Sequence, residues 1–184
     1  MDCLKLYPEI YGAELPLRPA LYLDLIDGYE KAKTAARIST KDFQSYKDLY
    51  KDIIEVFSRQ LVLVAGINNI IHRKDFNAFA SIDGGTLSSL EKFSGKTLSD
   101  RFKYLDDCWY NIDREIIDTE VRNSIAHNNV NYDEISQIIE YFPEGGGIKP
   151  TPAQQIYFLD FMRMILVTFR EVNNLHHFVK CLFY

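Results

Sequence analysis

Apolar side chains recur at intervals of three and four residues over long parts of the chain. One series runs from Phe43 to Ile71 and another from Tyr157 to Val172. This spacing places apolar residues on one face of an α-helix, whereas a half-buried strand would alternate them with polar residues. The sequence therefore predicts a long helix over about 41–73, a preceding helix over about 18–37, and a last long helix that begins near Thr151.

Shorter elements are expected between these long helices. The sequence Asp83-Gly84-Gly85 predicts a turn. A short helix then opens near Thr86, with Thr86 and Ser89 as candidate caps, and ends at Gly95. A further helical stretch, which allows a break, starts at Thr97 or Ser99 and runs to Ile125. We expect Asn128-Asn129 to stop it.

A β-hairpin is expected over residues 135–150, where the β-favouring run 135–142 is followed by three glycines and a return strand over 148–150. No proline occurs between Pro19 and Pro143, which favours long helices. The predicted fold class is all-α: a bundle of four or more helices with this small hairpin before the last long helix. We expect one domain over residues 1–184, with residues 1–17 as an N-terminal extension and 135–150 as an insertion.

The composition of the 184 residues, 47% hydrophobic and 26% charged, suits a folded core. The longest apolar run, Leu61–Ala65, is far shorter than the roughly 20 residues that a membrane span requires, and no basic and apolar leader opens the sequence. Cys3, Cys108 and Cys181 form no CxxC pair and cannot all be bridged. We therefore expect a cytoplasmic protein with no membrane partner and no disulfide framework.

The net charge of −5 is unevenly distributed. Basic residues dominate from Lys31 to Lys51, and acidic residues dominate from Asp106 to Glu120. Two interpretations stay open: both stretches are solvated helix faces that attract one another, or the basic stretch is a surface that attracts phosphate. A pI of about 5.4 argues against a protein that coats nucleic acid non-specifically, so any nucleic-acid contact must be local.

Several common catalytic motifs are missing from the sequence. It contains no GxxxxGKS/T or GxGxxG phosphate loop, no GxSxG nucleophile elbow and no HExxH zinc motif. His176 and His177 are adjacent and would point about 100° apart on a helix, so they cannot hold one ion from one face. We expect no metal site and no cofactor.

The stretch from Val121 to Asp133 combines residue types suited to phosphodiester cleavage without a metal. Arg122 offers a permanent cation with a forked set of donors, His127 exchanges protons near neutral pH, and Asn123 precedes His127 by one helical turn. In a continuous helix, Arg122 and His127 would point about 140° apart. Their convergence requires the helix to end at His127, which Asn128-Asn129 allows, or a second copy of the chain.

The motif Arg122-Asn123-x-x-x-His127 near a helix end resembles the Rx4–6H signature of the HEPN superfamily. The segment that follows, with its glycine turn and final long helix, resembles HEPN domains of bacterial abortive-infection and related phage-defence proteins. The resemblance covers about residues 40–180, and Arg122, Asn123 and His127 are its diagnostic residues.

This resemblance implies a metal-independent endoribonuclease that acts as a homodimer on RNA in bacterial defence or toxin–antitoxin biology, with an antitoxin or a sensor as a further partner. His127 would act as general base or acid, Arg122 would stabilise the charged transition state, and Asn123 would orient His127 or the phosphate.

Two alternatives to the ribonuclease stay open. The chain is a non-catalytic HEPN-like module for dimerisation, nucleotide binding or regulation, or it is an unrelated helical protein. Arg122 would then pair with Asp118 one turn earlier, and His127 would only cap a helix end. The acidic stretch just upstream of the motif would also repel RNA. A catalytic site requires Arg122 and His127 to face a shared cleft that solvent reaches.

Overall fold

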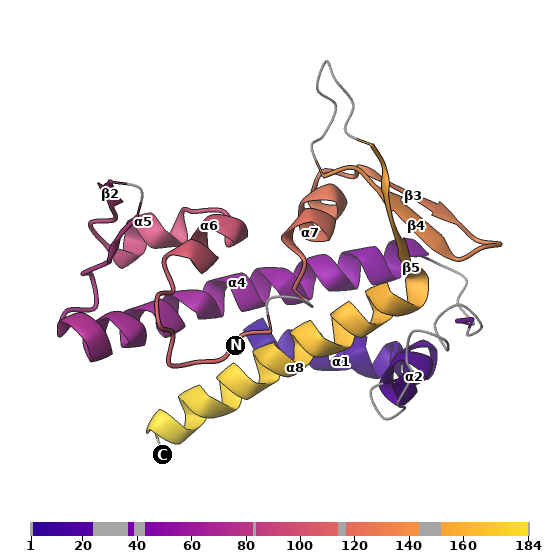
Figure 1. Ribbon diagram of the computed structural model, residues 1–184. Helices are drawn as coiled ribbons and strands as arrows, with labels where there is room; N and C mark the ends of the chain where they lie inside the picture. Colours follow the sequence, from indigo (N-terminus) through magenta and orange to yellow (C-terminus); the bar gives the residue numbers. More distant parts are fainter. Residues whose placement is uncertain are drawn as a thin grey trace. The chain divides into compact units, whose positions relative to one another are not determined.

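The computed structural model describes residues 2–23, 37–38, 43–82, 84–113, 117–143 and 152–183. These residues form seven helices and five strands (Figure 1). The helices are α1 (Asp2–Gly12), α2 (Glu14–Leu23), α4 (Phe43–Arg73), α5 (Leu90–Ser94), α6 (Leu98–Lys103), α7 (Thr119–Ala126) and α8 (Phe158–Phe183). The strands are β1 (Ser81–Ile82), β2 (Gly85–Thr86), β3 (Val130–Asp133), β4 (Ile138–Tyr141) and β5 (Gln154–Tyr157).

The chain divides into two compact units. The first contains residues 1–54 and 114–184, and the second contains residues 55–113. Helix α4 is continuous, so its beginning belongs to the first unit and its remainder to the second. The Arg122/His127 motif lies in the first unit. The expectation of a single domain over residues 1–184 stays a prediction.

An aromatic cluster lies at the centre of the first unit. The ring of Tyr50 on α4 lies 5.3 Å from the ring of Phe161 on α8, and the rings of Phe43 and Phe158 lie 5.8 Å apart. Both pairs meet edge to face, an arrangement that aromatic rings prefer. Tyr50, Phe158 and Phe161 are fully buried, and burying a Phe side chain contributes about 1.5–3 kcal/mol. These contacts join the first turns of α4 to α8.

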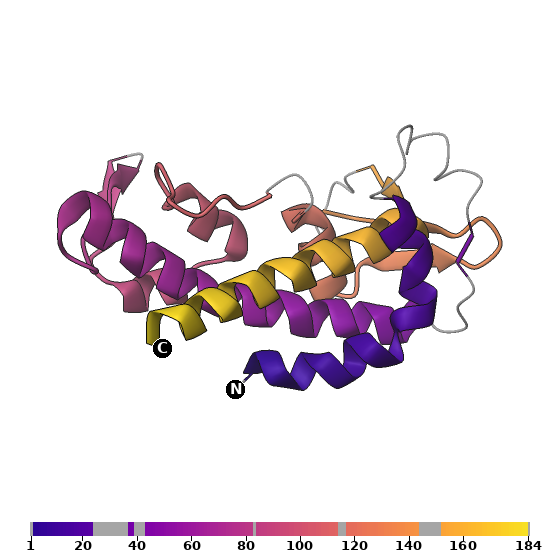
Figure 2. The ribbon, with the colours of Figure 1, turned by 90° about the horizontal axis from the view of Figure 1, so that it is seen from below.

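Helices α1 and α2 pack against α8 in the first unit (Figures 1 and 2). Helix α1 buries Cys3 and Leu6, and α2 buries Leu17. Pro16 lies in the first turn of α2, where backbone N–H groups have no partner within the helix, so the proline ring is tolerated. The described part of the expected N-terminal extension therefore contributes to this core.

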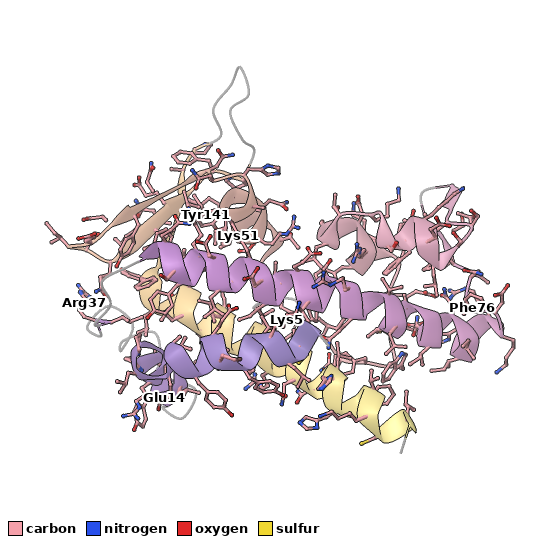
Figure 3. All side chains as sticks on the ribbon, turned by 180° about the vertical axis from the view of Figure 1, so that it is seen from behind. Lys5, Glu14, Arg37, Lys51, Phe76 and Tyr141 are labelled. Atoms are coloured by element: carbon pink, nitrogen blue, oxygen red, sulfur yellow. The ribbon has the colours of Figure 1, made fainter. Side chains whose placement is uncertain are left out.

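Strands β3, β4 and β5 form an antiparallel sheet in the first unit. Ile139 and Tyr141 of β4 are buried, and Tyr141 is labelled in Figure 3. The side chain of Gln137, which lies in the turn before β4, accepts a bond from the N–H of Ile38 at 2.9 Å and donates one to its carbonyl at 2.8 Å. The turn therefore holds a residue that is distant in the sequence.

The prediction of an all-α bundle with one small hairpin is wrong. The described residues contain a three-stranded and a two-stranded antiparallel sheet besides the helices. Strand β5 lies in the segment expected to start the last long helix, so α8 begins at Phe158 and not near Thr151. Ile156 and Tyr157 of β5 pair with Ile139 and Ile138 of β4. This pairing between distant residues outweighs the local signal for a helix start, because short apolar runs suit both kinds of element.

The predicted hairpin over 135–150 is correct only for one strand. Strand β4 lies within the predicted run 135–142, but its hairpin partner is β3, which precedes it. Asp133 makes the turn between them, since its carboxylate accepts bonds from the N–H groups of Ile135 and Ser136. A bond from the Ser136 hydroxyl and, after it, these backbone bonds lower the pKa of Asp133. The predicted return strand over 148–150 lies outside the described residues.

The predicted helix over 41–73 is confirmed in its described part, which α4 fills, and Gly95 and Thr97 are confirmed as caps of α5 and α6. The short helix expected to open near Thr86 begins at Leu90, because Ser89 is its N-cap and Thr86 pairs with Ser81 in the two-stranded sheet. The stretch expected from Thr97 to Ile125 is broken, because α6 ends at Lys103 and α7 begins at Thr119. In place of the helix expected over 18–37, α2 begins at Glu14 and is described to Leu23.

By length and composition alone, α4 is apolar enough to cross a membrane. Its 18-residue window has a mean hydropathy of 1.3, and 61% of that window is buried within the protein. The core helix of a folded domain passes the same test, and this burial accounts for the apolar face of α4. The expected absence of a membrane partner stays a prediction.

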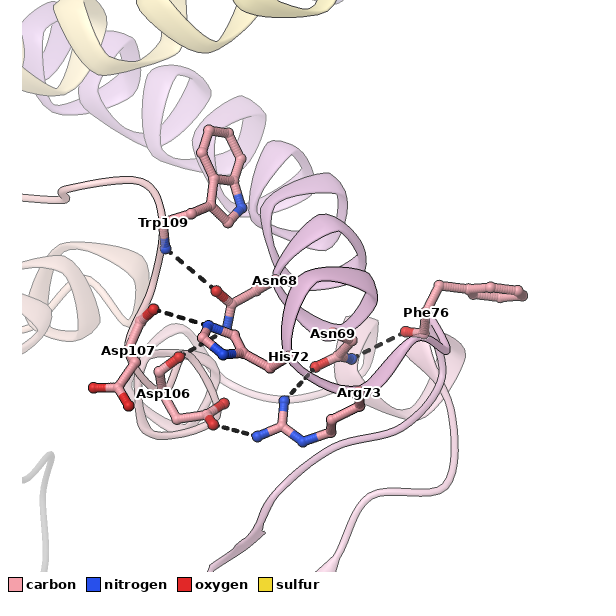
Figure 4. Close-up of polar contacts among 8 residues, drawn as sticks. All are labelled: Asn68, Asn69, His72, Arg73, Phe76, Asp106, Asp107 and Trp109. Carbon is pink, nitrogen blue, oxygen red and sulfur yellow. Dashed lines mark hydrogen bonds and ion pairs between the residues drawn. The ribbon is translucent and has the colours of Figure 1, made fainter.

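In the second unit, a polar network joins α4 to the loop after α6 (Figure 4). The buried Asn68 donates from Nδ2 to the carbonyl of Asp106 at 2.7 Å, and its Oδ1 accepts from the N–H of Trp109 at 3.3 Å. Arg73 pairs with the Asp106 carboxylate, and the His72 ring lies 3.2 Å from the carbonyl of Asp107. Asn68 therefore satisfies two backbone groups of a loop that has no regular structure of its own.

We expect Asn68→Ala to lower the free energy of unfolding by about 2 kcal/mol, because the Asp106 carbonyl and the Trp109 N–H both lose their partner. The exposed Asn111→Ala in the same loop is the matched control and should change stability by less than about 0.5 kcal/mol. Urea unfolding followed by circular dichroism measures both. Equal stabilities of the two variants would contradict the role of Asn68.

Candidate functional site

Helix α7 carries the predicted motif and is capped at its start by Asp118. The Asp118 carboxylate accepts hydrogen bonds from the N–H groups of Glu120 at 2.7 Å and Val121 at 3.2 Å. A carboxylate here satisfies free N–H groups and complements the positive end of the helix dipole. The alternative pairing of Asp118 with Arg122 is absent. No carboxylate in the described parts of the chain lies within ion-pair distance of Arg122.

The other end of α7 is closed by a left-handed turn at Asn128. The N–H of Asn128 donates to the carbonyl of Ile125 at 3.2 Å, and the N–H of Asn129 donates to that of Ser124 at 2.7 Å. This pair of bonds is a Schellman motif, in which the left-handed position, here Asn128 with φ 59°, usually holds glycine. The predicted helix stop at Asn128-Asn129 is therefore confirmed, and His127 is the C-cap of α7.

The structure brings together two of the three predicted site residues. Nη1 of Arg122 donates to Oδ1 of Asn123 at 3.0 Å, and both side chains are half-buried. His127 is exposed, and its backbone N–H donates to the carbonyl of Asn123 at 3.0 Å. No hydrogen bond joins the His127 ring to Arg122, to Asn123 or to another residue that the structure describes. The ring is thus accessible, and no hydrogen bond connects it to the Arg122 guanidinium within one chain.

Two tyrosines lie close to the first turns of α7. Tyr50 of α4 is fully buried, and this burial raises the pKa of its hydroxyl, with a further contribution from the Asp118 carboxylate and an opposing one from Arg122. Tyr141 of β4 donates to Oε1 of Gln154 at 2.8 Å, and burial, followed by Asp118 and Glu120, raises its pKa. The Arg122 guanidinium therefore lies near both a buried hydroxyl and the cap carboxylate, without forming an ion pair.

Lys47 is a residue that the sequence did not single out. It lies on α4 with only 5% of its surface exposed, and its Nζ donates to Oδ1 of Asn128 at 2.6 Å. The expectation that the stretch from Lys31 to Lys51 forms a solvated face is therefore wrong at Lys47. The signal was present in the spacing, since Lys47 follows Phe43 by four residues and precedes Tyr50 by three, on the buried face.

The acidic stretch from Asp106 to Glu120 does not form one continuous carboxylate face in its described part. Asp118 caps α7, and Glu120 accepts a bond from Nε2 of Gln154 at 3.0 Å. In the second unit, Asp106 pairs with Arg73. Of these three carboxylates only Asp106 is paired with a cation, so Asp118 and Glu120 keep their negative charge beside the motif.

Other candidate sites lie away from the motif. In the described residues, no group of three or more His, Cys, Asp or Glu side chains is arranged to hold a metal ion. The rings of His176 and His177 are 6.3 Å apart, and burial of His176 lowers its pKa. A cavity of about 350 Å³ lies between α1 and α4, where Glu9 and Tyr46 line it, and it contains none of the predicted site residues.

No protein-family model matches this sequence, and no match was found among curated proteins or solved structures. The site must therefore be interpreted from its own geometry.

We expect Tyr50→Phe to leave the free energy of unfolding unchanged or to raise it by up to about 1 kcal/mol, because the buried Tyr50 hydroxyl has no hydrogen-bond partner among the described residues. Tyr141→Phe is the matched control. It removes a hydroxyl bonded to Gln154 and should cost about 1 kcal/mol. Thermal and urea unfolding compare the two. A large loss of stability in Tyr50→Phe would show that its hydroxyl is engaged.

Proposed function

We propose that this protein is a metal-independent endoribonuclease of the HEPN type. In the proposed reaction, the ribose 2′-oxygen forms a bond to the adjacent phosphorus while the bond to the 5′-oxygen of the next nucleotide breaks. The products are a 2′,3′-cyclic phosphate and a 5′-hydroxyl. One general base takes the 2′-proton, and one general acid gives a proton to the leaving oxygen.

The observation that carries the proposal is the exposed His127 at the capped end of α7, directly after the turn that holds Arg122 and Asn123. An exposed imidazole that no described residue engages is available to exchange a proton with substrate. His127 is the C-cap of α7, and its backbone N–H still donates to the Asn123 carbonyl, so the ring leaves the helix end in a direction that the helix sets.

Arg122 has the donors that the charged transition state requires. One of its guanidinium nitrogens is bonded to Asn123, and its remaining N–H groups have no partner in the described residues. The guanidinium presents five N–H donors in a planar fork, which suits two oxygens of one phosphate. Asn123 would fix the orientation of this fork, so its role is positioning.

The proposal includes a homodimer, because no hydrogen bond joins the side chains of Arg122 and His127 within one chain. Two copies related by a two-fold axis near the end of α7 would supply two arginines and two histidines to one cleft. A cytoplasmic role in bacterial defence or in a toxin–antitoxin system, with an antitoxin or sensor partner, follows only from the resemblance to HEPN proteins and is part of the same proposal.

One observation favours the alternative of a non-catalytic HEPN-like module. Arg122 is engaged by Asn123 within its own chain, and the carboxylates of Asp118 and Glu120 lie on the same short helix. A dimerisation, nucleotide-binding or regulatory module would need no free imidazole, however, and the exposure of His127 favours the enzyme.

We expect the purified protein to cleave single-stranded RNA in the presence of EDTA and to leave DNA intact, because DNA lacks the 2′-hydroxyl. His127→Ala should reduce cleavage by roughly 100- to 10,000-fold, the usual contribution of general acid–base catalysis. Arg122→Lys should also lose activity, since a point charge does not replace a two-pronged grip on phosphate. A fluorescent oligonucleotide assay measures all three rates.

The exposed Asn131→Ala on β3 is the control for the ribonuclease assay, and its rate should equal that of the parent. Cleavage that requires added magnesium, or a His127→Ala variant as active as the parent, would contradict the proposed mechanism.

We expect light scattering to give about twice the mass of one chain at micromolar concentration. Ala126→Glu at the exposed end of α7 should shift the protein toward monomer, since the added charges of two copies would face each other across the two-fold axis. Asn111→Glu in the second unit is the control. A monomeric parent, or a dimer that Ala126→Glu leaves intact, would contradict a dimer formed through this helix end.

A further inference from the structure

We infer that Lys47 is a positioning residue of the proposed ribonuclease. Its hydrogen bond to Asn128 fixes the turn after His127 and so determines the position of the His127 ring. This inference rests on the proposed function and extends it to a residue on another helix, far from the motif in the sequence.

Lys47 is a buried lysine. Only 5% of the residue is exposed, and no described carboxylate lies within ion-pair distance of its ammonium. Burying an unpaired charge costs several kcal/mol, so the surroundings must compensate. The bond to Oδ1 of Asn128 at 2.6 Å is charge-assisted, and the ammonium lies at the carbonyl end of α7, where a cation is favourable.

Asn128 has an unusual backbone conformation. Its φ of 59° is left-handed, a region that only glycine adopts without cost and that asparagine tolerates better than most residues. The backbone bonds from Asn128 and Asn129 to the last turn of α7 require this conformation. By fixing the Asn128 side chain, Lys47 restricts the residue whose backbone follows His127 directly.

Two hydrogen bonds connect the turn at Asn128-Asn129 to the rest of the first unit. The N–H of Phe142, just after β4, donates to the carbonyl of Asn129 at 3.2 Å. The turn is therefore attached to α4 through Lys47 and to the sheet through Phe142. His127 is exposed, but the turn that follows it is fixed by the hydrogen bonds from Lys47 and Phe142. The accessible imidazole therefore has a defined position.

The burial of Lys47 distinguishes a positioning role from direct contact with RNA. A lysine that is 5% exposed and whose Nζ is bonded to Asn128 should contribute little to the binding of a phosphate strand or to its dependence on salt. Loss of Lys47 should therefore lower kcat and leave KM and the salt dependence of cleavage unchanged, because a small displacement of a catalytic group slows the reaction by up to about 100-fold.

The experiment compares kcat and KM of Lys47→Met with those of Lys5→Met, an exposed lysine on α1 labelled in Figure 3. Methionine is apolar and of similar length, so it fills the same space without the bond to Asn128. We expect kcat of Lys47→Met to fall about 10- to 100-fold at constant KM, and Lys5→Met to behave as the parent.

Two substitutions at Asn128 keep the test valid if Lys47→Met folds poorly. Asn128→Gly retains the left-handed conformation but removes the acceptor, and Asn128→Asp keeps an acceptor for Lys47. We expect kcat of Asn128→Gly to fall as far as kcat of Lys47→Met. The kcat of Asn128→Asp should stay well above that of both these variants. An Asn128→Gly variant as active as the parent would overturn the inference, as would a rise in KM with a weaker salt dependence in Lys47→Met.

A spectroscopic readout distinguishes failure of this inference from failure of the proposed function. The chain has four histidines, so the imidazole proton–carbon NMR signals are few, and His127→Ala assigns one of them. We expect Lys47→Met to shift the His127 signal and to leave those of His72, His176 and His177 in place. If the parent does not cleave RNA, the ribonuclease proposal fails. If the His127 signal does not move, the positioning role fails.

Discussion

The first turns of α4 are the constraint on which the first unit depends. A helix buries one face, and here the aromatic rings of Phe43 and Tyr50 on that face pack against α8. Lys47 lies between them on the same face, so the side chain of Lys47 is buried together with the rings. That charge has to be stabilised locally, and the end of α7 supplies both an acceptor at Asn128 and the negative end of a helix dipole.

Helix α7 is too short to be stable alone. It has eight residues, and isolated helices shorter than about 12–15 residues are marginal in water. Asp118 satisfies N–H groups at its start, the turn at Asn128 satisfies carbonyls at its end, and β4 packs against it. The geometry of the candidate site is therefore a property of the first unit as a whole.

The engaged carboxylates explain how a basic motif can exist directly after an acidic stretch. Asp118 is used as a helix cap and Glu120 is bonded to Gln154, so neither forms an ion pair with Arg122. The guanidinium instead bonds to the neutral amide of Asn123, which orients it without neutralising its charge. A positive charge that is oriented and not neutralised is what recognition of a phosphate requires.

Local signals in the sequence determined the helices and the helix end. Apolar spacing predicted α4, Ser89 and Thr97 predicted the starts of α5 and α6, and Asn128-Asn129 predicted the end of α7. Each of these features depends on neighbours within one or two helical turns. The same signals identified Arg122, Asn123 and His127 as site candidates. The bond between Arg122 and Asn123 and the exposure of His127 required the structure.

Only the tertiary structure decided the three-stranded sheet and the place of Lys47. Residues 154–157 form a strand because Ile156 and Tyr157 pair with β4, and the buried Lys47 donates a hydrogen bond to Asn128, 81 positions away. The spacing of Phe43, Lys47 and Tyr50 places Lys47 on the buried face of its helix, but neighbouring residues encode neither its acceptor nor the strand that pairs with residues 154–157. Pairing and burial depend on which distant segments meet, and the free energy of those contacts exceeds the local preference of a four-residue strand or a single lysine.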